Sequence, residues 1–291
     1  MTAAPDRAGT LHVVATPIGN LADLTPRART VLESADLVLA EDTRHSGALL
    51  RHFGIDKPLR SLHEHNESER IADVLARLRS GEQIALVSDA GTPLISDPGY
   101  RLLAAVRAEG MRASPVPGPC AAIAALCVSG LATDRFVFEG FLPPKRAARR
   151  ARLDMLRSEF RTLLVYETGR RLTALLDDLV EIFGPDRRAT LARELTKLYE
   201  EVAYGSLAEL AGRSRGDASA TRGELVLVVE GASADAPDDR VDAEALLRAL
   251  VEALPPGQAA AIVARLTGRP RGALYDQALA LGAGALGSED S

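Results

Sequence analysis

The first 116 residues alternate short apolar runs with segments of helical periodicity, and this alternation restricts the fold most strongly. The apolar runs are of strand length and cover residues 11–15, 36–40, 59–63, 83–88 and 112–116. Between them, apolar residues recur with helical spacing over residues 26–34, 46–52, 67–80 and 99–109. Such a series of βαβ units predicts a mostly parallel sheet that helices cover on both faces.

A second series begins after an alanine-rich helix expected at residues 121–126. Its strands are expected at residues 135–139, 162–167, 189–194, 201–204 and 224–230, which predicts a second sheet. Residues 231–239 are small and acidic and include proline, as in a linker, and helical spacing returns over residues 241–254, 258–267 and 272–281. We therefore predict an α/β fold of two αβ domains, residues 8–118 and 119–232, followed by a small helical domain at residues 241–285. A cleft is expected between the two αβ domains.

Polar loops rich in glycine and proline follow three of the predicted strands. The longest connects the strand ending near Ser88 to the helix after Gly99 and contains two carboxylates, Asp89 and Asp97. Shorter loops follow at residues 16–20 and 115–120. Because ligands of open α/β sheets bind outside the carboxyl ends of the strands, these loops predict a small-molecule site, although proline-stiffened connectors would have the same composition. None of them matches the usual dinucleotide or triphosphate loop.

Five motifs in this order resemble one enzyme family. They are V-V-A-T-P-I-G-N-L-A-D-L (13–24), A-D-L-V-L-A-E-D-T-R-H (35–45), S-D-A-G-T-P-L-I-S-D-P-G (88–99), D-R-F-V-F-E-G-F-L-P (134–143) and A-R-E-L-T-K-L-Y-E-E (192–201). The chain resembles the bacterial small-subunit ribosomal RNA cytidine 2′-O-methyltransferases of the tetrapyrrole methylase superfamily. Residues 257–275 also resemble the small helical tail of that family. The chain departs from the family pattern at Cys120, where serine is usual, and at Gly169 and Arg170, where proline and histidine are common.

The resemblance implies that S-adenosylmethionine binds in a cleft between the two αβ domains. By motif position, the residues implied to hold it in the first domain and the helix after it are Pro17, Asp89, Gly91, Thr92, Pro93, Ser96, Ala121 and Ala122. From the second domain we add Tyr166, Glu224 and Leu225. Backbone groups and Asp89 would satisfy the polar parts of the cofactor, and apolar side chains would bury the adenine.

A ribose hydroxyl is a poor nucleophile at neutral pH, so a base in reach would help the reaction. The candidates at the end of the second strand are Glu41, Asp42 and His45, with Arg44 as a phosphate contact. The alternative is that Glu41 and Asp42 only cap a helix and pair with Arg44. Further candidates are His63, His65, Arg193, Glu194 and Lys197. No histidine spacing matches a zinc site, and we expect no metal.

A net charge of −5 argues against a protein that coats nucleic acid nonspecifically, so RNA contacts must be local. The strongest basic segment contains Lys145, Arg146, Arg149, Arg150 and Arg152, and a weaker cluster in the tail contains Arg265, Arg269 and Arg271. The first segment is also compatible with an ordinary solvated helix face. Aromatic residues are few, and Phe53, Phe138, Phe141, Tyr166 and Tyr199 are expected in the core.

The partner implied by the resemblance is the RNA of the small ribosomal subunit, and a homodimer is expected. No stretch is apolar enough for a membrane span or a signal peptide, so we expect a cytoplasmic protein. Two alternatives stay open at this point. One is a methylase acting on a tetrapyrrole, and the other is a noncatalytic RNA-binding factor in ribosome assembly.

Overall fold

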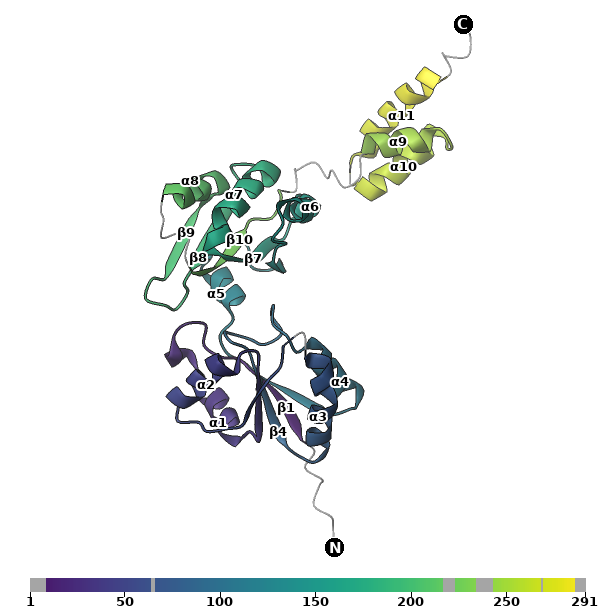
Figure 1. Ribbon diagram of the computed structural model, residues 1–291. Helices are drawn as coiled ribbons and strands as arrows, with labels where there is room; N and C mark the ends of the chain where they lie inside the picture. The colour runs from purple at the N-terminus through teal and green to yellow at the C-terminus, as the bar shows by residue number, and fades with distance from the viewer. Residues whose placement is uncertain (1–8, 64–65, 217–222, 234–242, 268, 286–291) are drawn as a thin grey trace. The chain divides into compact units, whose positions relative to one another are not determined.

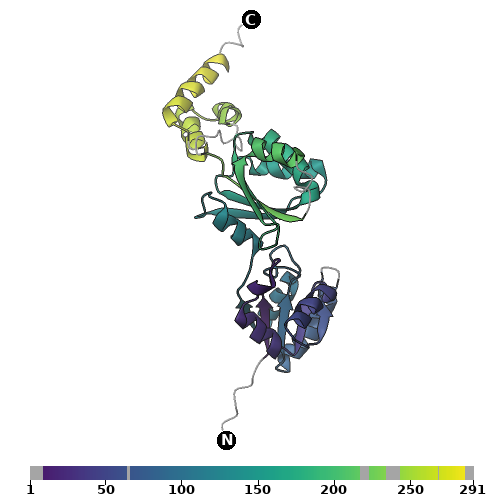
Figure 2. The same cartoon turned by 90° about the vertical axis from the view of Figure 1, so that its left-hand side faces the viewer.

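The computed structural model describes residues 9–63, 66–216, 223–233, 243–267 and 269–285. The chain forms two compact units. The larger contains the chain up to Asp154 together with Arg161–Glu230, and the smaller contains Met155–Phe160 and the chain from Gly231 onward. The larger unit holds two β-sheets, each with its own helices (Figures 1 and 2).

The first sheet has five parallel strands in the order β3-β2-β4-β1-β5. These are β1 (Thr10–Val14), β2 (Leu37–Ala40), β3 (Leu59–Ser61), β4 (Gln83–Val87) and β5 (Arg112–Val116). Its helices are α1 (Pro26–Ser34), α2 (Thr43–His52), α3 (Glu67–Arg79) and α4 (Tyr100–Ala108), and a 3-10 turn, η1, covers Leu21–Asp23. Because β4, β1 and β5 are neighbours, the three polar loops predicted from the sequence leave the same edge of the sheet side by side.

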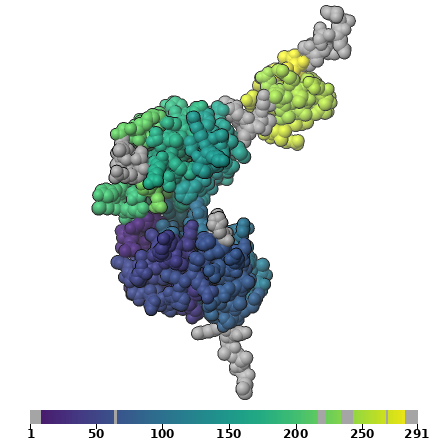
Figure 3. Space-filling view, in the orientation of Figure 1, coloured from purple at the N-terminus to yellow at the C-terminus, as the bar shows by residue number. Residues whose placement is uncertain are grey.

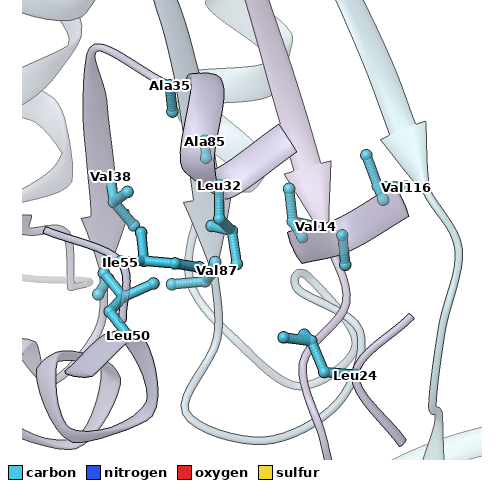
Figure 4. Packing of buried hydrophobic residues seen from close by; sticks show 12 residues of the cluster. Val14, Leu24, Leu32, Ala35, Val38, Leu50, Ile55, Ala85, Val87 and Val116 are labelled. Atoms are coloured by element: carbon cyan, nitrogen blue, oxygen red, sulfur yellow. The ribbon is translucent and has the colours of Figure 1, made fainter. Parts of the chain in front are cut away.

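Alternating side chains along the strands supply two separate cores. On one face, Leu32 of α1 and Leu50 of α2 pack in a cluster with Val38 and Val87 of the sheet (Figure 4). On the other face, helices α3 and α4 pack against Leu39 and its neighbours. Burying such side chains stabilises the fold by about 1.5 to 3 kcal/mol each. The prediction of a parallel sheet covered on both faces is therefore confirmed.

The second sheet has the order β6-β7-β10-β8-β9. Its strands are β6 (Phe136–Phe141), β7 (Thr162–Thr168), β8 (Arg188–Arg193), β9 (Glu201–Ser206) and β10 (Glu224–Val229). Only β6 and β7 pair in parallel among these described strands, and the other neighbours are antiparallel. The accompanying helices are α5 (Ala121–Val128), α6 (Arg146–Leu156), α7 (Gly169–Phe183) and α8 (Leu207–Gly216).

Helix α5 covers one face of the second sheet, and α7 and α8 lie over the opposite face (Figure 1). Ala125 and Leu126 of α5 pack with Leu164 and Val228 of the sheet. In the space-filling view the first sheet and its helices are purple to blue, and the second sheet and its helices are teal to green (Figure 3). The predicted fold class, two αβ parts followed by helices, is confirmed.

The smaller unit contains α9 (Ala243–Val251), α10 (Pro256–Thr267) and α11 (Arg271–Ala285). Leu247, Val263 and Leu274, one from each helix, form its core. Most of the predicted linker, residues 234–239, lies outside the described residues, and the predicted domain boundaries stay predictions. Within the described part of the chain, no helix combines the length and the apolar character that a membrane span requires.

Candidate active site

Hydrogen bonds join the three polar loops at the carboxyl edge of the first sheet. The backbone N–H of Thr16 donates to the carbonyl of Gly91 at 2.8 Å, and the N–H of Gly91 donates back to the carbonyl of Thr16 at 3.1 Å. The hydroxyl of Thr92 donates to the carbonyl of Pro119 at 2.9 Å. The loop after β4 is therefore fixed to the loops after β1 and β5, and its backbone is held in place before any ligand binds.

Two loops adopt strained backbone conformations. Among the described residues other than glycine, a positive φ occurs only at Leu94 (73°), Ser96 (70°), Glu194 (51°) and Thr196 (67°). Such conformations cost about 1 to 3 kcal/mol each and persist where surrounding contacts enforce them, often at functional sites. The first pair lies in the loop after β4, and the second lies in the loop between β8 and β9.

Three neighbouring strands of the second sheet place Tyr166, Val226 and Ala192 side by side, and we call these three residues the wall. Val226 of β10 pairs in register with Tyr166 of β7 and with Ala192 of β8. The phenol oxygen of Tyr166 accepts a hydrogen bond from the backbone N–H of Ala122 at 3.1 Å, which ties the wall to the start of α5. Burial raises the pKa of Tyr166, so its hydroxyl stays neutral. The ring of Phe141 contacts Tyr166 edge-on, with centroids 5.6 Å apart.

These loops and this wall line a pocket of about 230 Å³. Among the residues predicted to hold a cofactor, those that line it are Asp89, Gly91, Thr92, Ser96, Ala121, Tyr166, Glu224 and Leu225. Pro17, Pro93 and Ala122 do not line it, although Ala122 holds Tyr166 as described above. The remaining lining comes from Ile18, Ala90, Ile95, Asp97, Cys120, Phe141, Glu167, Ala192, Glu194, Leu195, Lys197 and Val226.

The charged side chains of the pocket are mostly acidic. The described lining carries the carboxylates of Asp89, Asp97, Glu167, Glu194 and Glu224, against one ammonium group, that of Lys197. The Lys197 ammonium lies 3.0 Å from Glu194 and 3.2 Å from Glu224, so its charge is already balanced. Burial opposes the charged forms of Lys197 and Glu194, but their mutual contact and the neighbouring hydrogen bonds prevail. They raise the pKa of Lys197 and lower that of Glu194. Glu167 is paired with the Arg171 guanidinium, 3.0 Å away, and the acidic charge that remains after these pairs favours a cationic ligand.

Asp97 is a lining carboxyl whose pKa is raised toward neutrality. Burial raises its pKa to about 7, the negative charge of Glu41 adds to this effect, a hydrogen bond with Ser88 opposes it, and Asp89 contributes a smaller upward shift. A carboxyl with a pKa close to the working pH is suited to act as a general base. The sequence placed Asp97 in the loop but did not single it out, because burial and the approach of Glu41 from another strand depend on the tertiary fold.

The four residues predicted to be catalytic do not line the pocket. Asp42 caps α2 by accepting from the N–H of Arg44, and its carboxylate pairs with the Arg44 guanidinium at 2.6 Å. The side-chain hydrogen bond from Arg44, helped by backbone N–H groups, holds the pKa of Asp42 far below its usual range. Asp42 is thus a weak base, and the capping alternative describes its contacts. Glu41 approaches Asp97, whereas Arg44 and His45 are exposed on the first turn of α2.

The basic segment predicted to contact RNA forms α6, where most of its charges pair within the protein. Arg149 is buried and lies 2.7 Å from Asp178, which is itself buried, so this guanidinium is not available to a phosphate, contrary to expectation. Arg150 bonds to Glu181 at 2.6 Å and Arg152 to Glu139 at 2.8 Å. Arg146 also bonds to Asp178, at 3.0 Å, but remains 68% exposed. Lys145 is exposed and forms no ion pair with the residues that the structure describes.

The further candidates for a catalytic role fall into two groups, those that line the pocket and those that do not. Glu194 and Lys197 line the pocket, whereas Arg193 pairs with Glu201 at 2.6 Å. His65 lies outside the described residues. The described residues contain no group of three or more side chains suited to hold a metal ion. Tyr199 and Phe141, which were expected in the core, are 73% and 53% exposed, and that expectation is wrong for both.

The family model for tetrapyrrole (corrin/porphyrin) methylases matches residues 10–211, which include most of this pocket. The chain belongs to the tetrapyrrole methylase family. A second model, the RsmI C-terminal HTH domain, matches residues 237–282 of this tetrapyrrole methylase.

Similar proteins of known sequence extend over almost the whole chain. A protein of Xylella fastidiosa is 53% identical over 92% of this methylase and 98% of its own length. One from Pseudomonas aeruginosa is 52% identical, with 94% and 97% covered. One from Escherichia coli O157:H7 is 49% identical, with 93% and 95% covered. Each of them is named ribosomal RNA small subunit methyltransferase I.

Solved structures share the fold at lower identity. The uroporphyrin-III-C-methyltransferase of Thermus thermophilus is 25% identical, has a TM-score of 0.51, and is covered over 94% of its chain, against 76% of this one. A cobalt precorrin-4 methyltransferase is 16% identical with a TM-score of 0.54, covering 79% of this methylase and 98% of its own chain. The second comparison concerns the fold alone.

Proposed function

We propose that this tetrapyrrole methylase transfers a methyl group from S-adenosylmethionine to the ribose 2′-hydroxyl of a cytidine in small-subunit ribosomal RNA. The observation that carries the proposal is the name shared by relatives at 49 to 53% identity along nearly the full chain, ribosomal RNA small subunit methyltransferase I. The two solved methyltransferases described above that are named for tetrapyrrole substrates are only 25% and 16% identical. The cytidine and the 2′-hydroxyl come from the motif resemblance.

The pocket fits the proposed cofactor chemically. A sulfonium is cationic, and the lining carries several carboxylates whose charge Lys197 only partly balances. Ile18, Ile95 and Val226 offer apolar surface for the adenine, and Gly91 lets a ligand approach the backbone closely. We assign the binding of the polar parts of the cofactor to Asp89, Thr92 and Ser96, the backbone at Ala121, and Glu224.

S-adenosylmethionine supplies a methyl group that its sulfonium already activates, so the protein mainly has to align the acceptor. Positioning of two reactants can contribute about 7 to 11 kcal/mol to the reduction of a barrier. We propose that a carboxylate oxygen of Asp97 would take the proton of the ribose hydroxyl while the hydroxyl oxygen bonds to the methyl carbon. The bond between that carbon and sulfur would break, with its electron pair leaving on the sulfur. Such a base contributes about 10² to 10⁴ in rate. Glu41 supports this role because its charge helps to keep the pKa of Asp97 near 7.

The surface that contacts RNA phosphates is proposed to include the exposed cations Lys145 and Arg146 at the start of α6 and Arg44 on α2. In the tail, Arg265, Arg269 and Arg271 are exposed as well. Arginine and lysine side chains bind phosphate oxygens through charge-assisted hydrogen bonds. Weaker binding of RNA at higher salt concentration is expected for such contacts.

We also propose that the enzyme is a homodimer in the cytoplasm, where its ribosomal substrate is assembled. The exposed apolar side chains of Ile123 and Val128 on α5 support an interface between copies. Light scattering on the purified protein measures the dimer directly.

The test of the proposed function uses small ribosomal subunits prepared without the methylation. The protein should transfer label from S-adenosylmethionine to the RNA of these particles and not to corrin precursors. Calorimetry should show that the protein binds the cofactor in the absence of RNA. Labelled corrin precursors would favour the small-molecule methylase, and a failure to bind the cofactor would favour a noncatalytic RNA-binding factor.

A further inference from the structure

The loop between β8 and β9 presents two exposed apolar side chains beside the pocket. Lys197 lines the pocket, and the next two residues, Leu198 and Tyr199, are 87% and 73% exposed. Leu198 is the most exposed large apolar side chain among the described residues. Neither of these two side chains belongs to the pocket lining, so the pocket does not account for their apolar character.

The loop that carries this pair is fixed internally. The Lys197 ammonium binds Glu194 and Glu224 at 3.0 and 3.2 Å, which anchors the loop to the start of β10. The carboxylate of Glu200 accepts from the N–H of Thr196 at 2.6 Å. The N–H of Glu200 donates to the carbonyl of Lys197 at 3.1 Å. The two exposed side chains therefore extend from a loop whose backbone is held by these ion pairs and hydrogen bonds.

The first domain contacts the same loop through Gly19. A Cβ atom added at Gly19 would lie 2.4 Å from the Cγ atom of Lys197, so the aliphatic part of the lysine packs directly on the glycine backbone. The loop after β1 and the loop after β8 thus meet at Lys197. Tyr199 is two residues farther along the chain, so its Cα atom lies within about 7 Å of that of Lys197, although Tyr199 is not itself part of the pocket lining.

An RNA methylase needs, close to its pocket, a surface that can hold an unstacked base. A nucleotide whose ribose enters a pocket must leave its stack, and the base released in this way is commonly held against an aromatic side chain. Stacking tolerates any base, because every base has a π face. A tyrosine on a rigid loop loses little conformational freedom when a base stacks on it.

We propose that Tyr199, flanked by Leu198, is the surface on which a base of the RNA substrate stacks while the ribose hydroxyl enters the pocket. This inference rests on the proposed function, since it takes RNA as the substrate. A second copy of the chain is the other conceivable occupant. The two-residue tip is small beside the roughly 800 Å² per partner that a stable interface buries. Its nearness in the chain to Lys197, a residue of the pocket lining, favours a substrate that enters the pocket, here the nucleic acid.

The test compares Tyr199→Ala, Tyr199→Phe and the matched control Tyr204→Ala. Tyr204 is also an exposed tyrosine, 55% exposed on β9 of the same sheet, but it lies outside the loop that contains Lys197; neither tyrosine lines the pocket itself. Tyr199→Ala should lower kcat/KM for small ribosomal subunits by about 5- to 150-fold, the range measured when a stacking aromatic is removed. Tyr199→Phe keeps the ring and should stay within about threefold of the wild type, as should Tyr204→Ala. The dissociation constant for S-adenosylmethionine should be unchanged in all three variants.

Equal kcat/KM values for Tyr199→Ala and Tyr204→Ala would overturn the proposal. So would a loss of cofactor binding in Tyr199→Ala, which would make Tyr199 a structural residue of the pocket. Dissociation of a dimer in this variant, measured by light scattering, would assign the tip to an interface between copies instead.

A direct binding measurement separates this inference from the proposed function. If the wild type methylates no RNA, the proposed function fails, and binding to small ribosomal subunits without turnover decides the role of Tyr199. Weaker binding by Tyr199→Ala than by Tyr204→Ala would then support stacking, and equal affinities, or no binding by the wild type, would contradict it.

Discussion

Asp97 shows how the tertiary fold changes the chemistry of a single residue. In the sequence it is one of two carboxylates in a polar loop, next to Pro98 and Gly99. In the structure it lines the pocket, and burial together with Glu41 raises its pKa to about 7. At this pKa a large fraction of the carboxyl is ionised near neutral pH, as a general base requires.

Replacing Asp97 by asparagine should therefore lower kcat by about 10² to 10⁴, the usual contribution of a general base. In the wild type, kcat/KM should fall as the pH drops below about 7, because Asp97 becomes protonated. That limb of the pH profile should be absent from the residual activity of Asp97→Asn. A wild-type profile that stays flat from pH 8 to about pH 5 would contradict the assignment.

Asp97→Asn should become more stable relative to the wild type as the pH rises, although it lowers activity. Between about pH 4 and pH 7 the folded protein keeps a proton on Asp97 that the unfolded chain has released, because the ordinary pKa is 3.8. The folded state binds more protons in this window, so the contribution of Asp97 to stability falls as the pH rises. The melting temperature of Asp97→Asn relative to the wild type should therefore increase from pH 4 to pH 8. A constant difference would show that the carboxyl is not buried as described.

Asp42 gives a contrasting prediction. Its carboxylate caps α2 and pairs with Arg44, so Asp42→Ala should lower the melting temperature while kcat stays within about threefold of the wild type. Asn also caps helices well, so Asp42→Asn should preserve most of the stability. Thermal unfolding and methyl transfer measured on both variants check this. A loss of about 10² or more in kcat for Asp42→Asn would restore Asp42 as the catalytic base.

At the scale of elements, helix α6 is held to α7 by ion pairs that a linear sequence does not reveal. Arg146 and Arg149 both bond to Asp178, and Arg150 bonds to Glu181. These partners lie 29 to 32 residues apart along the chain. The sequence shows the run of arginines clearly. It does not show which carboxylates a distant helix places opposite them, and for this reason the run resembled an RNA-binding face.

Arg149→Ala should consequently destabilise the fold. It removes a charged hydrogen bond to the buried Asp178, while Arg146 still contacts that carboxylate, so we expect a loss of about 1.5 to 3 kcal/mol in the free energy of unfolding. Lys145→Ala, one turn away on the exposed side, is the matched control and should leave the free energy of unfolding unchanged. Urea denaturation of both variants measures the difference. Equal stabilities would contradict the buried pair, and weaker RNA binding by Arg149→Ala at full stability would favour the original RNA-contact hypothesis.

The elements themselves could largely be predicted, because periodicity and turn residues are local signals. Helix α1 begins and ends where Thr25, Pro26 and the apolar spacing indicated. The strand β5 has the predicted bounds, residues 112–116. The pairing of the second sheet was harder, because the position of β10 between β7 and β8 depends on contacts between segments far apart in sequence.

At the scale of the whole molecule, the pocket belongs entirely to the larger unit, since all of its lining lies between Ile18 and Val226. The first-domain loops of the pocket could be predicted from their glycine, proline and hydroxyl content. In the second domain the motif resemblance indicated Tyr166, Glu224 and Leu225. It did not indicate Glu167 and Ala192, because these residues lie in strands with ordinary composition. Only the register of β7, β8 and β10 brings such positions together.

The most direct test of the account maps methyl groups on ribosomal RNA. Small ribosomal subunits from cells that lack this gene would be incubated with the purified enzyme and isotopically labelled S-adenosylmethionine, and the RNA would be digested to nucleosides for mass spectrometry. The account predicts label on the 2′-oxygen of a cytidine, with most of it lost when Asp97→Asn replaces the wild type. Label on a base, or no label in RNA from an enzyme that binds the cofactor, would contradict the central claim.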